Sequence, residues 1–89
     1  MKVFFVAYDL VGAESDEYIK LDNKINGNFK DSIKIQASLW SLKVEDNYTC
    51  KSLKEKLLKL IDNNDKLLII QPKAYSCRKC IKPPHKLKD

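Results

Sequence analysis

Hydrophobic and polar residues follow four strand-like patterns along this chain. Residues 3–8 form a continuous apolar run, VFFVAY, which is typical of a strand covered on both faces. Residues 32–36 and 38–44 alternate between polar and apolar positions, which indicates two strands joined by a very short bend. Residues 67–70, LLII, form another apolar run, and Pro72 ends it. The chain is therefore expected to contain four strands.

Two amphipathic segments separate these strands. Ser15 is expected to cap a helix that ends near Gly27, and Thr49 is expected to cap a second helix. Apolar residues recur in each segment at spacings of three and four, as on one face of a helix. These residues are Tyr18, Leu21, Ile25 and Phe29 in the first segment, and Leu53, Leu57, Leu60 and Ile61 in the second.

The order β-α-β-β-α-β predicts an α+β fold of the ferredoxin-like type, with a four-stranded antiparallel sheet and two helices on one face. We expect the first and last strands, which are continuously apolar, at the centre of the sheet and the two alternating strands at its edges. The ferredoxin-like domain is expected to span residues 1–72, followed by a C-terminal tail over residues 73–89. A chain of this length buries only roughly 60–65% of its unfolded surface. We therefore expect a second subunit to cover the other face of the sheet in a homodimer.

Positive charge is concentrated in the tail. The chain has 17 basic and 12 acidic residues, and residues 73–89 hold six of the basic and one of the acidic residues. The tail therefore carries a net charge of +5, and residues 1–72 are neutral. Such a tail indicates contacts with RNA, DNA or an acidic protein partner, and a solubilising tail is the alternative. The candidate phosphate-binding residues of the tail are Lys73, Arg78, Lys79, Lys82 and Lys86.

No apolar run approaches the ~18 residues that span a bilayer, and the N-terminus lacks a signal-peptide pattern. We therefore expect a cytoplasmic protein with no membrane partner.

The first strand ends in a carboxylate. Asp9 at a rigid sheet edge suits a metal ligand or an acid/base group, and a cap of the following loop is the alternative reading. The only histidine, His85, lies in the tail, so the expected core contains no histidine that could act as a general base.

The tail also contains a Cys-x-x-Cys pair. Cys77 and Cys80, followed by His85, have the spacing of half a zinc site that Cys50 would complete. A tail disulfide and two free thiols are the alternatives. We favour thiols over zinc, because a structural zinc site of this size normally shows two paired sets of ligands.

Three short motifs resemble those of one superfamily. Residues 6–10, VAYDL, resemble the Tyr-Asp motif of the small CRISPR-associated spacer-acquisition subunit. Residues 35–40, IQASLW, are similar to that superfamily's hydrophobic-Gln-x-Ser-hydrophobic-aromatic signature. Residues 57–69 resemble its helix-Asp-x-x-Asp-strand passage, especially in the SinR-like branch. The resemblance covers roughly residues 2–71.

This resemblance implies a homodimer whose relatives include VapD-type toxin ribonucleases and a messenger-RNA-cleaving antitoxin. It implies that Asp9 is the catalytic residue and Mg²⁺ ligand, and that it faces its mate across the two-fold axis. Gln36 and Ser38 would then orient the backbone or a phosphate. Lys34 is the nearest equivalent of an arginine that the family often carries, and it would bind phosphate as a point charge.

The resemblance thus predicts a nucleic-acid-binding protein and, where it cuts, a Mg²⁺-dependent endonuclease acting on RNA rather than DNA. The alternative is a non-catalytic interaction module, an adaptor or inhibitor that uses the same dimer to bind a protein partner.

Overall fold

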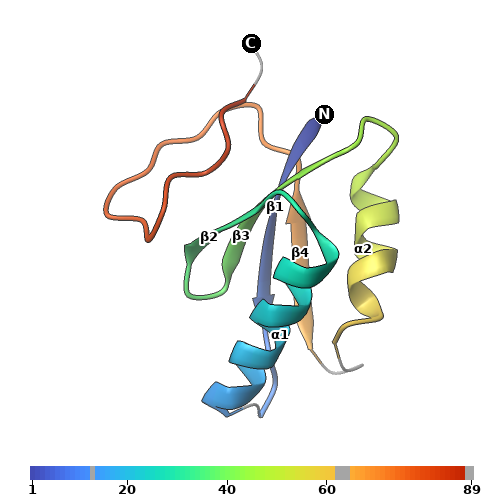
Figure 1. The fold of residues 1–89 in the computed structure, drawn as a ribbon, viewed down its shortest axis with the longest axis vertical. Coiled ribbons are helices and arrows are strands. Elements are labelled where there is room, and N and C mark those ends of the chain that lie inside the picture. The colour runs from blue at the N-terminus through green and yellow to red at the C-terminus, as the bar shows by residue number, and fades with distance from the viewer. Residues whose placement is uncertain (13, 62–64, 88–89) are drawn as a thin grey trace.

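The computed structural model describes residues 1–12, 14–61 and 65–87, and it shows a sheet with two helices (Figure 1). The strands form one antiparallel sheet in the order β2-β3-β1-β4, which is the order of a ferredoxin-like fold. The predicted fold class is confirmed. The elements are β1 (Lys2–Asp9), α1 (Ser15–Asn28), β2 (Ser32–Gln36), β3 (Leu39–Val44), α2 (Cys50–Leu58) and β4 (Lys66–Ile70).

The predicted positions of two strands within the sheet are wrong. The central strands are β1 and β3, so β4 lies at an edge although its sequence is continuously apolar. In β4, Leu67 and Ile69 pack against the core, whereas Leu68 and Ile70 are 57% and 44% exposed. The alternating strand β3 is central because it pairs with both β1 and β2, and its polar residue Ser41 is fully buried on the face of the sheet away from the helices.

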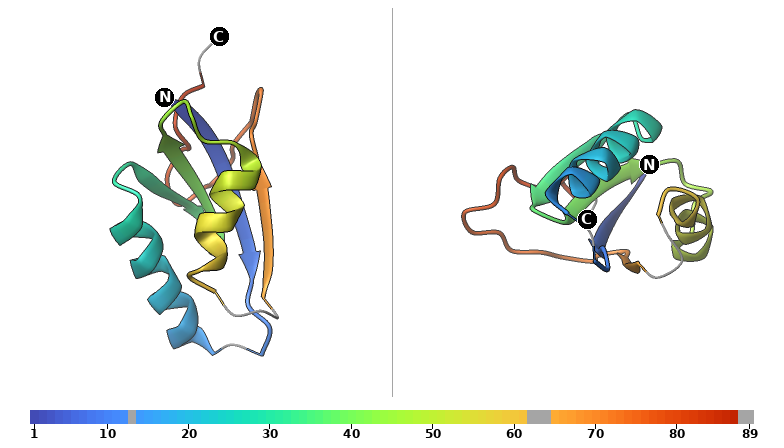
Figure 2. Two further views of the ribbon diagram at one scale, coloured as in Figure 1. Left: turned by 90° about the vertical axis from the view of Figure 1, so that its right-hand side faces the viewer. Right: turned by 90° about the horizontal axis from the view of Figure 1, so that it is seen from below.

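Both helices pack on one face of the sheet (Figure 2). The helix boundaries confirm the expected cap of α2 and correct that of α1. Thr49 accepts a hydrogen bond from the Ser52 amide at 3.1 Å, and the Ser52 hydroxyl accepts one from the Thr49 amide at 2.8 Å. In α1, Ser15 is already helical, and Glu14 occupies the N-cap position without a side-chain cap bond. The core residues are Phe4, Val6, Tyr8, Leu10, Leu21, Ile25, Phe29, Trp40, Leu42, Val44, Leu53 and Leu57, and Leu60 and Ile61 pack at the margin of this core beyond α2.

The tail lies across the opposite face of the sheet and contains no helix or strand over residues 73–87 (Figure 2). Its contacts reach three strands. The centroids of the Tyr75 ring and of the Phe5 ring on β1 lie 5.6 Å apart, and the Ile81 amide donates a hydrogen bond to the Ile35 carbonyl of β2 at 2.8 Å. On β3, Ser41 accepts a hydrogen bond from the His85 amide at 3.2 Å. The face that we expected a second subunit to cover is thus partly covered by the chain itself.

Of the predicted turn at residues 62–65, only Asp65 belongs to the described residues. Neither described helix is both long and apolar enough to cross a membrane.

Candidate functional site

Asp9 is the last residue of β1, and its side chain is exposed. Tyr18 of α1 holds this end of the strand. The Tyr18 hydroxyl donates to Asp9 Oδ1 at 3.3 Å and accepts a hydrogen bond from the Leu10 amide at 3.0 Å. The loop amide of Val11 donates to Asp65 Oδ1 at 3.1 Å, so Asp65 provides a side-chain cap for the loop after β1. The exposed Asp9 carboxylate remains suited to a ligand or acid/base role.

An apolar surface adjoins Asp9 on the face of the sheet that lies away from the helices. Ala7 pairs with Leu68 and Phe5 pairs with Ile70 in the β1–β4 ladder, so these four residues share that face. Ala7, Leu68 and Ile70 form what we call the open patch, which lies at the β1–β4 side of the sheet, and Asp9 follows Ala7 at its end.

A complete metal site does not form within the described part of one chain. Among the described residues, no three His, Cys, Asp or Glu side chains lie close enough together to hold a metal ion. Asp9 offers carboxylate oxygens, which suit Mg²⁺, but a site of the expected kind needs a second carboxylate from another copy.

The four candidate zinc ligands are likewise not brought together. Cys50 begins α2, carries a free thiol and packs beside the core. Cys77 and Cys80 form a disulfide, and the two ring nitrogens of His85 contact other residues. The favoured expectation of two free thiols at the Cys-x-x-Cys pair is therefore wrong, and the structure contains the alternative, the disulfide.

The residues of the predicted phosphate-orienting motif have different environments. Gln36 is exposed at the end of β2. Ser38 lies in the turn before β3, where its carbonyl accepts a hydrogen bond from the Tyr8 amide at 3.2 Å. Lys34 forms an ion pair with Asp22 of α1 and is only partly exposed. Its ammonium group therefore already has a carboxylate partner inside the protein.

Asp22 is the polar residue that the sequence analysis missed. Its carboxylate accepts hydrogen bonds from the Tyr8 hydroxyl and from Trp40 Nε1, the latter at 3.3 Å, in addition to its pair with Lys34. Trp40 Nε1 also donates to the Tyr8 hydroxyl at 3.0 Å. Burial raises the pKa of Tyr8 far above its ordinary value, and the hydrogen bond to Asp22 raises it further. Tyr8 and Trp40 belong to two of the motifs that resemble the superfamily, and here they form part of a structural hydrogen-bond network with Asp22.

A signal for Asp22 was present in the sequence. Asp22 directly follows Leu21 of the apolar stripe of α1. An acidic side chain beside such a stripe needs a hydrogen-bond donor if it does not face solvent. The polar ends of a buried tyrosine and a buried tryptophan need such a partner.

His85 anchors the tail to the sheet. Its side chain is 8% exposed, with Nδ1 2.6 Å from the Ser41 hydroxyl and Nε2 2.8 Å from Asp31 Oδ1. The three side chains have the connectivity of a Ser-His-Asp triad. Ser41 is fully buried, however, so no substrate reaches its hydroxyl in this conformation. The arrangement fixes the tail in place.

The tail displays all five of its predicted phosphate-binding side chains to solvent. Residues 73–87 contact the sheet through the ring of Tyr75, the amide of Ile81 and the ring of His85. The cationic side chains of this segment do not take part in these contacts and are exposed. These cationic residues are Lys73, Arg78, Lys79, Lys82 and Lys86. The docked tail is the structure's candidate nucleic-acid interface.

A scan against protein-family models and a search of curated proteins found no match to this chain. The superfamily resemblance therefore depends on the three short motifs, and it stays a prediction.

Proposed function

We propose that this chain is a nucleic-acid-binding protein that works as a homodimer, as its resemblance to the spacer-acquisition subunit implies. One observation carries the proposal: five exposed cationic side chains lie along a tail that is docked on the sheet, while residues 1–72 have no net charge. Cations held on a folded surface contact phosphates with less loss of conformational entropy than the same cations on a free tail.

The open patch supports the dimer. Leu68 and Ile70 are large apolar residues on an edge strand, and such exposed strand residues favour pairing with another chain. A second copy is the partner that the superfamily resemblance implies. Covering the patch would remove this apolar surface from water, while the part of the tail that contacts β2 and β3 through Ile81 and His85 lies away from the patch.

Mg²⁺-dependent cleavage of RNA is the second candidate function, and the position of Asp9 favours it. The carboxylate is exposed, is held by Tyr18 and lies beside the open patch. Two Asp9 residues across a dimer axis would supply oxygen ligands for Mg²⁺, which polarises a phosphate and activates water when it is bound. Each Asp9 carboxylate would hold the ion, and the positive charge of the ion would offset the repulsion between the two carboxylates.

Binding and cleavage are tested with purified full-length protein and end-labelled RNA and DNA strands, with Mg²⁺ or with a chelator. Asp9→Asn is compared with Asp16→Asn, which changes an exposed carboxylate on α1. We expect binding by all three proteins and Mg²⁺-dependent cleavage by the wild type and Asp16→Asn only. Cleavage that persists in Asp9→Asn would exclude the catalytic role of Asp9.

An absence of binding to either nucleic acid at low salt would refute the nucleic-acid proposal and favour the adaptor or inhibitor. Binding without any cleavage would support the proposed nucleic-acid interface and refute the proposed endonuclease activity.

A further inference from the structure

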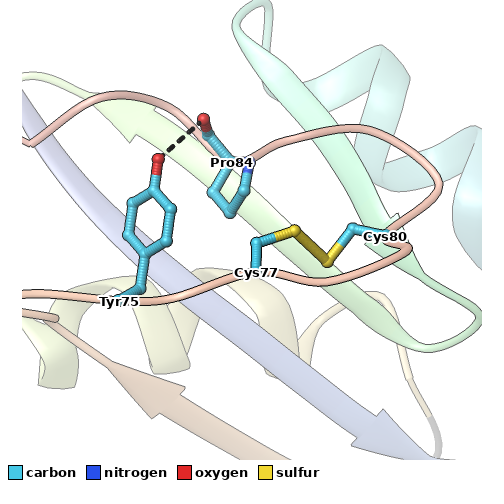
Figure 3. The surroundings of a disulfide bond; sticks show 4 residues. All are labelled: Tyr75, Cys77, Cys80 and Pro84. Carbon is cyan, nitrogen blue, oxygen red and sulfur yellow. Dashed lines mark hydrogen bonds between the residues drawn. A yellow bond between two sulfur atoms is a disulfide. The ribbon is translucent and has the colours of Figure 1, made fainter.

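The Cys77–Cys80 disulfide lies where the tail reverses direction (Figure 3). The outgoing arm carries Tyr75 and the returning arm carries Pro84, and the Tyr75 hydroxyl donates to the Pro84 carbonyl at 3.2 Å. Between the two cysteines, Lys79 has a φ of 54°, a left-handed conformation that is uncommon for a residue with a side chain. The reversal is therefore a defined turn that the disulfide closes.

The disulfide is accessible to reagents in solution. Cys77 is exposed and Cys80 is half-buried, so an incoming thiolate reaches the Cys77 sulfur more readily. The intervening residues Arg78 and Lys79 are both cationic, and positive charge stabilises the thiolate that leaves when a disulfide is attacked. Exposed disulfides in such surroundings belong to the labile class rather than the structural one.

The same bond is placed between two contacts that dock the tail. Tyr75, two residues before Cys77, lies against Phe5, and Ile81, directly after Cys80, donates its amide proton to Ile35. A closed turn limits the positions that these two contacts can take relative to one another. Oxidation should therefore favour docking, and docking should favour oxidation by the same factor.

We propose that Cys77 and Cys80 form a thiol–disulfide exchange site for low-molecular-weight thiols, and that its oxidation state sets how firmly the tail is docked. A thiolate attacks the Cys77 sulfur, forms a mixed disulfide and breaks the Cys77–Cys80 bond. The bonding electron pair leaves on the Cys80 sulfur, which takes a proton from water. A second thiol then attacks the mixed disulfide, which releases the small-molecule disulfide and leaves Cys77 as a thiol.

The exchange is tested with full-length protein that carries Cys50→Ser, so that the pair contains the only cysteines. The protein is equilibrated with mixtures of reduced and oxidised glutathione, and free thiols are counted by mass after alkylation. We expect two thiols to appear together in one transition. A pair that stays fully reduced, or fully oxidised, over the whole range of mixtures would overturn the exchange site.

Docking is read from hydrogen exchange of the Ile81 amide, which is compared between the oxidised and the reduced protein. We expect this amide to exchange up to about twentyfold faster in the reduced protein, because the chain entropy lost when a disulfide closes a four-residue loop corresponds to about this factor at 25 °C. The double variant Cys77→Ser, Cys80→Ser should exchange at the reduced rate whether or not thiols are present. Equal exchange in the oxidised and reduced proteins would overturn the coupling. Neither readout involves nucleic acid, so the result is independent of the proposed function.

Discussion

Replacing His85 by alanine tests whether the tail is an integral part of the fold. The substitution removes the Nδ1 partner of the Ser41 hydroxyl at 2.6 Å and the Nε2 partner of Asp31 at 2.8 Å. Ser41 is fully buried, so its hydroxyl cannot turn to solvent while the tail stays docked. The Asp31 carboxylate is exposed, so water can replace the contact with His85 that is lost.

The expected magnitude follows from this difference. A hydrogen bond contributes about 0.5–1.5 kcal/mol net, and a buried group left without its partner costs about 1–3 kcal/mol. The Ser41 oxygen still accepts a hydrogen bond from the backbone amide of residue 85 at 3.2 Å, so the substitution removes only the contact between the Ser41 hydroxyl and the imidazole. The loss of this buried contact should dominate, so His85→Ala should lower the free energy of unfolding by about 1–3 kcal/mol. For a domain of this size each kcal/mol corresponds to about 4–8 °C in the melting temperature.

The assay is urea unfolding followed by the fluorescence of Trp40, the one tryptophan of the chain. Lys86→Ala, a change at the neighbouring exposed position, is the matched control and should stay within about 0.5 kcal/mol of the wild type. Ser41→Ala and the double variant complete a cycle in which the two substitutions should be strongly non-additive. If His85→Ala matches Lys86→Ala and the cycle is additive, the tail does not dock as described.

Two further predictions concern the core network and the open patch. Because the pKa of Tyr8 is raised in the folded protein, stability should be intact below the ordinary tyrosine pKa of about 10 and should fall as the pH rises further. Tyr8→Phe should flatten that decline in urea unfolding between pH 9 and pH 11, and an unchanged decline would contradict the assignment. Leu68→Asp should shift sedimentation from dimer to monomer, whereas Ile19→Asp on α1 should leave the dimer intact. A wild type that sediments as a monomer at high concentration would exclude the dimer.

The fold class was predictable because the period of the apolar residues differs between helices and strands. The alternation in β3 and the stripe in α1 each identified their element, and Thr49 identified the start of α2. Strand order was less accessible. A continuous apolar run is typical of a central strand, but in β4 it belongs to an edge whose outer residues remain exposed.

The candidate site was predictable only in its individual residues. Asp9 at the end of β1 follows from the pattern, and its position beside the open patch follows from the strand register. The pairing of Lys34 with Asp22 and the docking of His85 on Ser41 join residues that are 12 and 44 positions apart. Such contacts depend on tertiary packing, which a local pattern does not contain.

The docking of the tail also changes how its role in binding should be tested. Removing residues 73–89 would uncover Ser41 and Ile35, so a loss of binding after truncation would be confounded by a loss of stability. Neutralising the exposed cations keeps the anchors in place. The neutralised variant replaces the five tail cations Lys73, Arg78, Lys79, Lys82 and Lys86 by glutamine. Its matched control replaces five exposed lysines of the helical layer and its borders: Lys20, Lys24, Lys51, Lys54 and Lys59.

The most direct measurement is the salt dependence of nucleic-acid affinity for these two variants and the wild type. Each lost phosphate contact flattens the log–log slope by about 0.7 for single strands and about 0.9 for duplexes. If three or four of the tail cations contact phosphates, the tail variant should lose about two to four units of slope, while the control retains nearly the full slope. Equal slopes for the two variants would contradict the central claim that the docked tail is the nucleic-acid interface.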